Sequence, residues 1–101
     1  MMDCVANMLT VARIDREAML ATPVCDIRQV EWYVTGRGLL ARVRDRRRQE
    51  WFAVVLPAKG GFMSLAVNVE TADEWWAVSD SESAARGKVL DMIDVREEEA
   101  A

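Results

Sequence analysis

The amino-acid sequence predicts a two-layer α+β domain, in which helices pack on one face of an antiparallel β-meander of four to five strands. The chain has 101 residues, of which 51% are hydrophobic, so it can bury one compact core. Strand-like segments separated by short turns follow one another from residue 29 to residue 69. With a helical segment at each end, residues 1–101 are expected to form a single domain.

The N-terminal helix is the first expected element. Apolar residues recur at helical spacing between residues 5 and 12, although the segment TVARI at 10–14 also suits a strand. Asp15 can cap a short helix, and Pro23 is expected to end it.

Two strands are expected between residues 29 and 45. Side chains alternate from 29 to 35, with Val30, Trp32 and Val34 on one face, as in a half-buried strand. The glycines at 36–38 supply a turn, and residues 39–45 form the next strand.

The following strands form the centre and the far side of the meander. Residues 50–56 carry apolar side chains on both faces of the expected strand, as is typical of a central strand. Pro57 is expected to stop this strand. Residues 63–69 alternate clearly between apolar and polar side chains, and residues 75–78 suggest a short fifth strand.

A C-terminal helix is predicted at about 80–93. The segment SDSE at 79–82 matches a capping box, in which the Ser79 side chain accepts from a helix amide and Glu82 reaches back to the Ser79 amide. An apolar stripe and acidic residues in the first turn support the helix, and the end of the chain is expected to fray.

Composition excludes several kinds of chemistry. The chain has no histidine, so it has no imidazole for a catalytic triad or a zinc site. Two cysteines, Cys4 and Cys25, are too few for a disulfide framework and are expected to be buried thiols. We therefore expect no enzymatic activity, no cofactor, no metal site and no catalytic residue.

Charge is unevenly distributed along the chain. Residues 36–62 contain seven basic and two acidic side chains, whereas residues 63–101 contain three basic and ten acidic ones, and the net charge is −4. The acidic half could imitate the phosphates of nucleic acid, but a solvated helix face accounts for it more simply.

Arginines dominate the basic region. Alternation places Arg42, Arg44 and Arg46 on one face of a strand, with Arg47 and Arg48 in the turn. This arrangement could follow the phosphates of a nucleic acid, or it could be a soluble hairpin end whose charges pair with acidic segments. The net negative charge favours the second interpretation.

Tryptophans provide the other candidate contact residues. Trp75 and Trp76 are adjacent, so they cannot both point inward from an extended strand, and one of them is expected at the surface. The candidate partner-binding residues are therefore Arg42, Arg44, Arg46, Arg47, Arg48, Trp75 and Trp76.

These features favour a small non-enzymatic module that binds another protein, of the accessory or inhibitory kind that phages and mobile elements encode. One alternative is a small apolar ligand between sheet and helices, suggested by six methionines and four tryptophans. Another is nucleic-acid binding through the arginine-rich hairpin 42–48. The sequence lacks an export signal and a membrane span, so we expect a cytoplasmic protein, and open sheet edges favour a homodimer.

Overall fold

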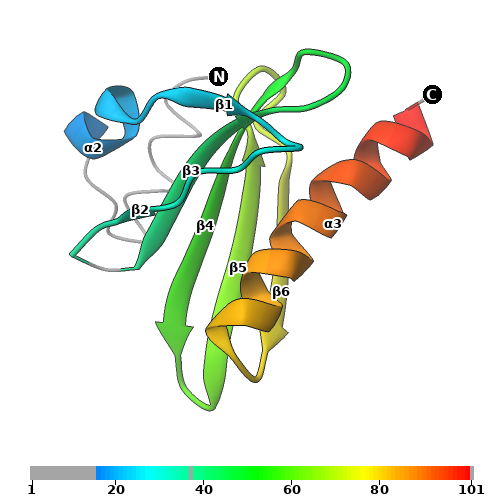
Figure 1. Cartoon of the computed structure of the whole chain (residues 1–101). Helices are drawn as coiled ribbons and strands as arrows, with labels where there is room; N and C mark the ends of the chain where they lie inside the picture. Colours follow the sequence, from blue (N-terminus) through cyan, green and yellow to red (C-terminus); the bar gives the residue numbers. More distant parts are fainter. Residues whose placement is uncertain (1–15, 37, 101) are drawn as a thin grey trace.

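The computed structural model describes residues 16–36 and 38–100 of the chain (Figure 1). They form a compact α+β domain with a six-stranded sheet and a long C-terminal helix. In chain order the elements are α2 (Arg16–Ala21), β1 (Val24–Asp26), β2 (Tyr33–Val34), β3 (Leu39–Arg44), β4 (Glu50–Ala58), β5 (Gly61–Asn68), β6 (Glu74–Ser79) and α3 (Glu82–Ala100). The short helix predicted before Pro23 is α2, whereas its predicted cap Asp15, the helical segment expected at 5–12 and the thiol of Cys4 lie outside the described residues.

Strands β3 to β6 form the predicted antiparallel meander, including the short fifth strand at 75–78, which is β6. The sheet as a whole is mixed, because β1 pairs with β3 in parallel, Val24 lying opposite Arg42. The prediction of a purely antiparallel sheet is therefore wrong. A turn after β1 reverses the chain, and the Gln29 amide donates to the Asp26 carbonyl over 2.9 Å within it.

The strand predicted at 29–35 shrinks to the two residues of β2. Strand β2 pairs with Leu39 and Leu40 of β3, whereas β1 pairs with Arg42 and the two residues after it. Both short strands therefore share one edge of β3, and neither can extend toward the other without displacing it.

Strand β4 continues through Pro57 to Ala58, so the prediction that Pro57 stops the strand is wrong. Pairing with β3 reaches only as far as Val55, and beyond this point β4 pairs with β5 alone. The Gln49 carbonyl accepts from the amide of Asp45, the residue after β3, so by alternation the odd-numbered residues of β4 direct their backbone groups toward β3. The nitrogen of Pro57 consequently faces a side on which β3 offers no partner.

The core occupies both faces of the sheet. Met19 of α2 packs against one face with Leu40, Phe52, Val54, Leu56, Leu65 and Val67. Ala85, Val89 and Ile93 of α3 pack against the other face, with Ala41, Val43, Trp51, Ala53, Val55 and Ala66. The prediction that both helices pack on one face is therefore wrong, since β4 and β5 are apolar in both directions and need cover on both.

Helix α3 begins two residues later than the capping box predicted, because Ser79 still belongs to β6. The Ser81 Oγ accepts from the Ala84 amide over 3.1 Å and caps the helix. Ser64 on β5 donates from its buried hydroxyl to the Ala85 carbonyl over 2.8 Å, which fixes α3 against the sheet. The helix continues to Ala100, past the predicted end near residue 93. Neither described helix is long and apolar enough to cross a membrane.

Candidate anion-binding site

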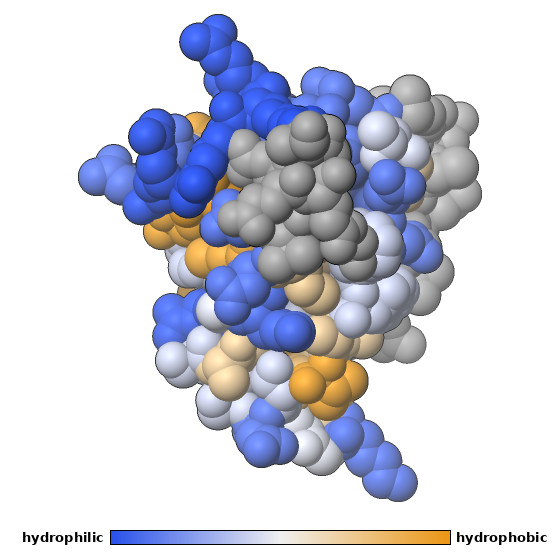
Figure 2. All heavy atoms as spheres, turned by 90° about the vertical axis from the view of Figure 1, so that its right-hand side faces the viewer, coloured by the Kyte–Doolittle hydropathy of each residue, from blue (hydrophilic) through white to orange (hydrophobic). Residues whose placement is uncertain are grey.

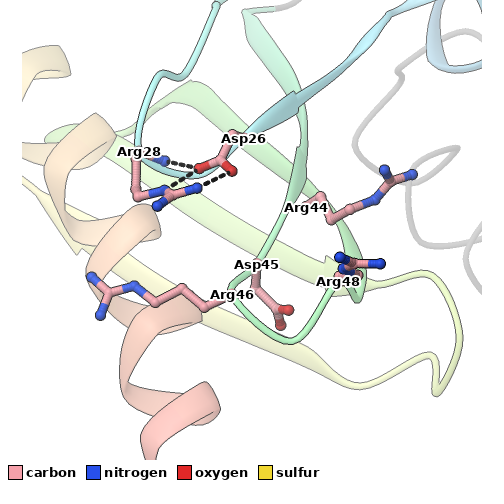
Figure 3. Close-up of a pocket in the computed structure, with 6 residues that line it drawn as sticks. All are labelled: Asp26, Arg28, Arg44, Asp45, Arg46 and Arg48. Atoms are coloured by element: carbon pink, nitrogen blue, oxygen red, sulfur yellow. Dashed lines mark hydrogen bonds and ion pairs between the residues drawn. The ribbon is translucent and has the colours of Figure 1, made fainter.

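An open pocket of about 590 Å³ lies where β1 ends and where β3 turns into β4. Figure 3 shows the side chains that surround it, which come from the two chain reversals after β1 and β3. Its lining consists of four arginines and two aspartates, namely Arg28, Arg44, Arg46, Arg48, Asp26 and Asp45.

Asp45 organises the turn between β3 and β4 from inside. Only 5% of this residue is exposed, and its Oδ1 accepts from the Arg47 and Gln49 amides, each over 2.9 Å. Its Oδ2 accepts from the Trp51 Nε1 over 3.0 Å. The carboxylate thus forms three hydrogen bonds with neutral donors of its own turn and strand, and these bonds fix the backbone that carries the arginines.

Asp26 is engaged by Arg28 in the turn after β1. The Arg28 guanidinium donates to both oxygens of Asp26 over 2.9 Å, and the Arg28 amide adds a bond of 2.8 Å (Figure 3). The side-chain and backbone hydrogen bonds from Arg28 hold the pKa of the Asp26 carboxyl well below its usual range. Both side chains of this pair are charged, and they meet most of each other's hydrogen-bonding capacity.

Arg44, Arg46 and Arg48 are the remaining cations of the pocket, and all three are exposed. No carboxylate of the described residues lies within ion-pair distance of them. They are placed to bind an anion from outside the chain.

The predicted ribbon on one face holds for Arg42 and Arg44, which alternate along β3, but not for Arg46. Arg42 is half-buried, with its Nε 3.0 Å from the Glu50 Oε2 and its guanidinium 5.9 Å from the centre of the Phe52 ring. Strand β3 ends at Arg44, so Arg46 lies in the turn beyond the strand. Figure 3 shows Arg44 and Arg46 pointing in different directions.

The sequence pattern did not indicate Arg28 and Asp26 as site residues. Arg47, which was predicted as a partner-binding residue, does not line the pocket. The D-x-R spacing at 26–28 indicates a local turn, but only the parallel pairing of β1 with β3 places that turn beside the arginines. Of the two tryptophans, Trp75 is half-buried on the α3 face and Trp76 is 47% exposed, which confirms that one of them lies at the surface.

An acidic turn borders the pocket end of the sheet. Glu70, Asp73 and Glu74 lie in or beside the β5–β6 turn, which Figure 1 places at the same end as the β3–β4 turn. Asn68 donates from its Nδ2 to the Gln49 Oε1 over 3.2 Å and so connects the two turns. The acidic turn and the arginine-lined pocket therefore lie at the same end of the sheet.

Arg48 adopts a φ of 67°, a left-handed conformation that glycine adopts without strain. We expect Arg48→Gly to leave stability unchanged or to raise it by up to about 1 kcal/mol, because relief of strain outweighs the added freedom of the unfolded chain. Thermal unfolding followed by circular dichroism measures this change. A loss of stability would contradict the exposed, unpaired position of the Arg48 side chain.

The fold and pocket define a small α+β domain with an arginine-lined surface site. Comparisons with protein-family models, curated proteins and solved structures find no match to this chain. Among residues 16–36 and 38–100, no group of three or more cysteines and carboxylates is arranged to hold a metal ion.

Proposed function

We propose that this protein is a small interaction module that binds a short acidic segment of a partner protein at the arginine-lined pocket. The observation that carries the proposal is the exposure of Arg44, Arg46 and Arg48 around one hollow whose carboxylates already have hydrogen-bond partners. Guanidinium groups pair with carboxylates through two parallel hydrogen bonds, which gives such a site direction as well as charge.

An acidic peptide fits this surface better than a nucleic acid does. Nucleic-acid binding draws its affinity from many phosphate contacts along a basic track. Here Arg42 is bound to Glu50, the acidic β5–β6 turn lies at the same end, and the chain carries a net charge of −4. A compact ligand with a few carboxylates avoids the repulsion that a long polyanion would meet.

The other expectations remain predictions. The described pocket is lined by charged side chains, so it does not favour the small apolar ligand. The absence of enzymatic activity, the accessory role in a phage or mobile element, the cytoplasmic location and the homodimer likewise stay predictions.

Charge reversal at Arg46 tests the proposal. The probe is a short fluorescein-labelled peptide of alternating glutamate and serine, and fluorescence anisotropy measures its dissociation constant. We expect Arg46→Glu to weaken binding about tenfold or more, because it replaces a charge-assisted hydrogen bond by repulsion. Lys59→Glu is the matched control, since it changes the net charge equally in the exposed β4–β5 turn at the other end of the sheet (Figure 1).

Three results would contradict the proposal. Equal weakening by both variants would show that only net charge matters. Tighter binding of a short thymidine oligonucleotide than of the peptide at physiological salt would favour the nucleic-acid alternative. A lack of saturable binding to the acidic peptide would remove the pocket as a carboxylate site.

A further inference from the structure

Strand β6 forms an edge of the sheet, and among the described residues it pairs only with β5. Its sequence, EWWAVS, contains no proline, lysine or arginine, and its pairing with β5 runs without interruption from Glu74 to Ser79. Natural edge strands are usually protected by such residues or by a bulge. An unprotected edge of six residues is therefore a candidate surface for another strand.

The unpaired backbone groups of β6 can be assigned from the ladder. The Asn68 amide donates to the Asp73 carbonyl over 2.8 Å, in register with the β5–β6 pairs. Antiparallel ladders alternate, so the odd-numbered residues of β6 bond to β5, and the N–H and C=O groups of Glu74, Trp76 and Val78 face outward. The ladder between β4 and β5 agrees, because the Val69 amide donates to the Glu50 carbonyl.

The same residues carry the exposed apolar side chains of this edge. Trp76 is 47% exposed and Val78 is 71% exposed, and they lie opposite Leu65 and Met63 of β5 on one face of the sheet. Figure 2 views the side of the molecule on which Figure 1 draws β6 and α3, and its hydrophobic atoms form separate areas among hydrophilic ones. A strand that joined this edge could cover both side chains.

Acidic side chains flank β6 and determine which strand would fit. Asp73, Glu74, Asp80 and Glu82 are all exposed, and residues 71–85 contain no basic side chain. A second copy is a poor partner, because antiparallel self-pairing centred on Ala77 places Glu74 opposite Asp80 across the joint. A segment with basic residues at its ends would pair with these carboxylates instead.

We infer that the outer edge of β6 binds an extended, basic-ended segment of another protein by strand addition. Backbone groups of Glu74, Trp76 and Val78 provide the ladder, and the Trp76 and Val78 side chains provide apolar contacts. This surface is separate from the arginine-lined pocket and has the opposite charge preference.

The test uses a peptide of alternating valine and threonine with lysine at both ends, and the same peptide with glutamate at both ends. Hydrogen exchange of the full chain, followed by NMR, reports the Trp76 and Val78 amides. We expect saturating lysine-ended peptide to slow their exchange about tenfold or more, because both amides become ladder donors. The glutamate-ended peptide is expected to leave the exchange rates unchanged.

Val78→Pro removes a backbone donor from the outer edge of β6 itself. Proline removes only an outward-facing donor at this position, so the bonds to β5 remain. We expect about tenfold weaker binding of the lysine-ended peptide, against less than about twofold for the control Val78→Thr, which keeps the donor. Trp76→Lys, which repels the peptide while keeping the backbone donor, serves if the proline variant unfolds.

Several outcomes would overturn the inference. Equal binding of the two peptides, protection elsewhere than on β6, or no protection at all would each exclude basic strand addition at this edge. Concentration-dependent self-association that Val78→Pro abolishes would show that a second copy is the occupant.

Discussion

Replacing Phe52 by alanine is expected to lower the free energy of unfolding by about 4 kcal/mol. Phe52 is 2% exposed and lies in the cluster with Leu40, Val54 and Leu65, so truncation leaves a cavity in the middle of the sheet. Urea denaturation measures the loss as a lower transition midpoint at an unchanged slope.

The matched control for this truncation is Val78→Ala. Val78 is 71% exposed on the edge strand, and its truncation should cost no more than about 0.5 kcal/mol. Similar losses at both positions would contradict the packing of Phe52 in the core.

Asp45→Ala is expected to cost about 3 kcal/mol, the second largest effect. The change deprives the Arg47 and Gln49 amides of their acceptor and leaves the buried Trp51 Nε1 without one. Asp45→Asn should cost less than Asp45→Ala, because the asparagine Oδ1 can still accept from both amides. It should still cost some stability, because the asparagine NH2 group and the indole N–H are both donors. Urea denaturation of both variants in wild-type and Trp51→Phe backgrounds forms a double-mutant cycle.

Asp45→Ala also separates two roles of Asp45 at the pocket. Simple electrostatics predicts that loss of a negative charge strengthens binding of the acidic peptide. Because Asp45 fixes the turn that carries Arg46 and Arg48, we expect weaker binding instead. Additive effects of Asp45→Ala and Trp51→Phe on stability, together with stronger peptide binding, would show that the carboxylate is only a counter-charge.

The local parts of the fold were predictable from the sequence, and the long-range pairings were not. Alternation and turn residues located β3 to β6, and the apolar stripe located α3, because each pattern depends on neighbours within a few residues. The parallel pairing of β1 depends on residues near Val24 meeting β3, which no local pattern encodes. The packing of α2 and α3 on opposite faces of the sheet likewise depends on the path of the chain between elements, which no local pattern encodes.

The residues of the candidate site were likewise predictable only where they are close together in the sequence. Arg44, Arg46 and Arg48 stood out because they are close in sequence, whereas Arg28 reaches the pocket through tertiary structure. Asp45 was counted as one charge among many, since the sequence alone does not show that its carboxylate turns inward onto Trp51. Arg42 lies on the same face of β3 as Arg44, but Glu50, the cross-strand partner of Arg44, binds the Arg42 guanidinium, and Arg42 does not line the pocket.

The attachment of β1 gives the two walls of the pocket unequal stability. Arg28 and Asp26 stand at the end of a strand only three residues long, whereas the opposite wall belongs to the hairpin of β3 and β4. Detachment of β1 requires the rupture of few hydrogen bonds and can occur while the rest of the sheet stays intact. Movement of this wall would change the width of the pocket, at the cost of core contacts, because Cys25 of β1 and Ile27 pack in the cluster on the α3 face.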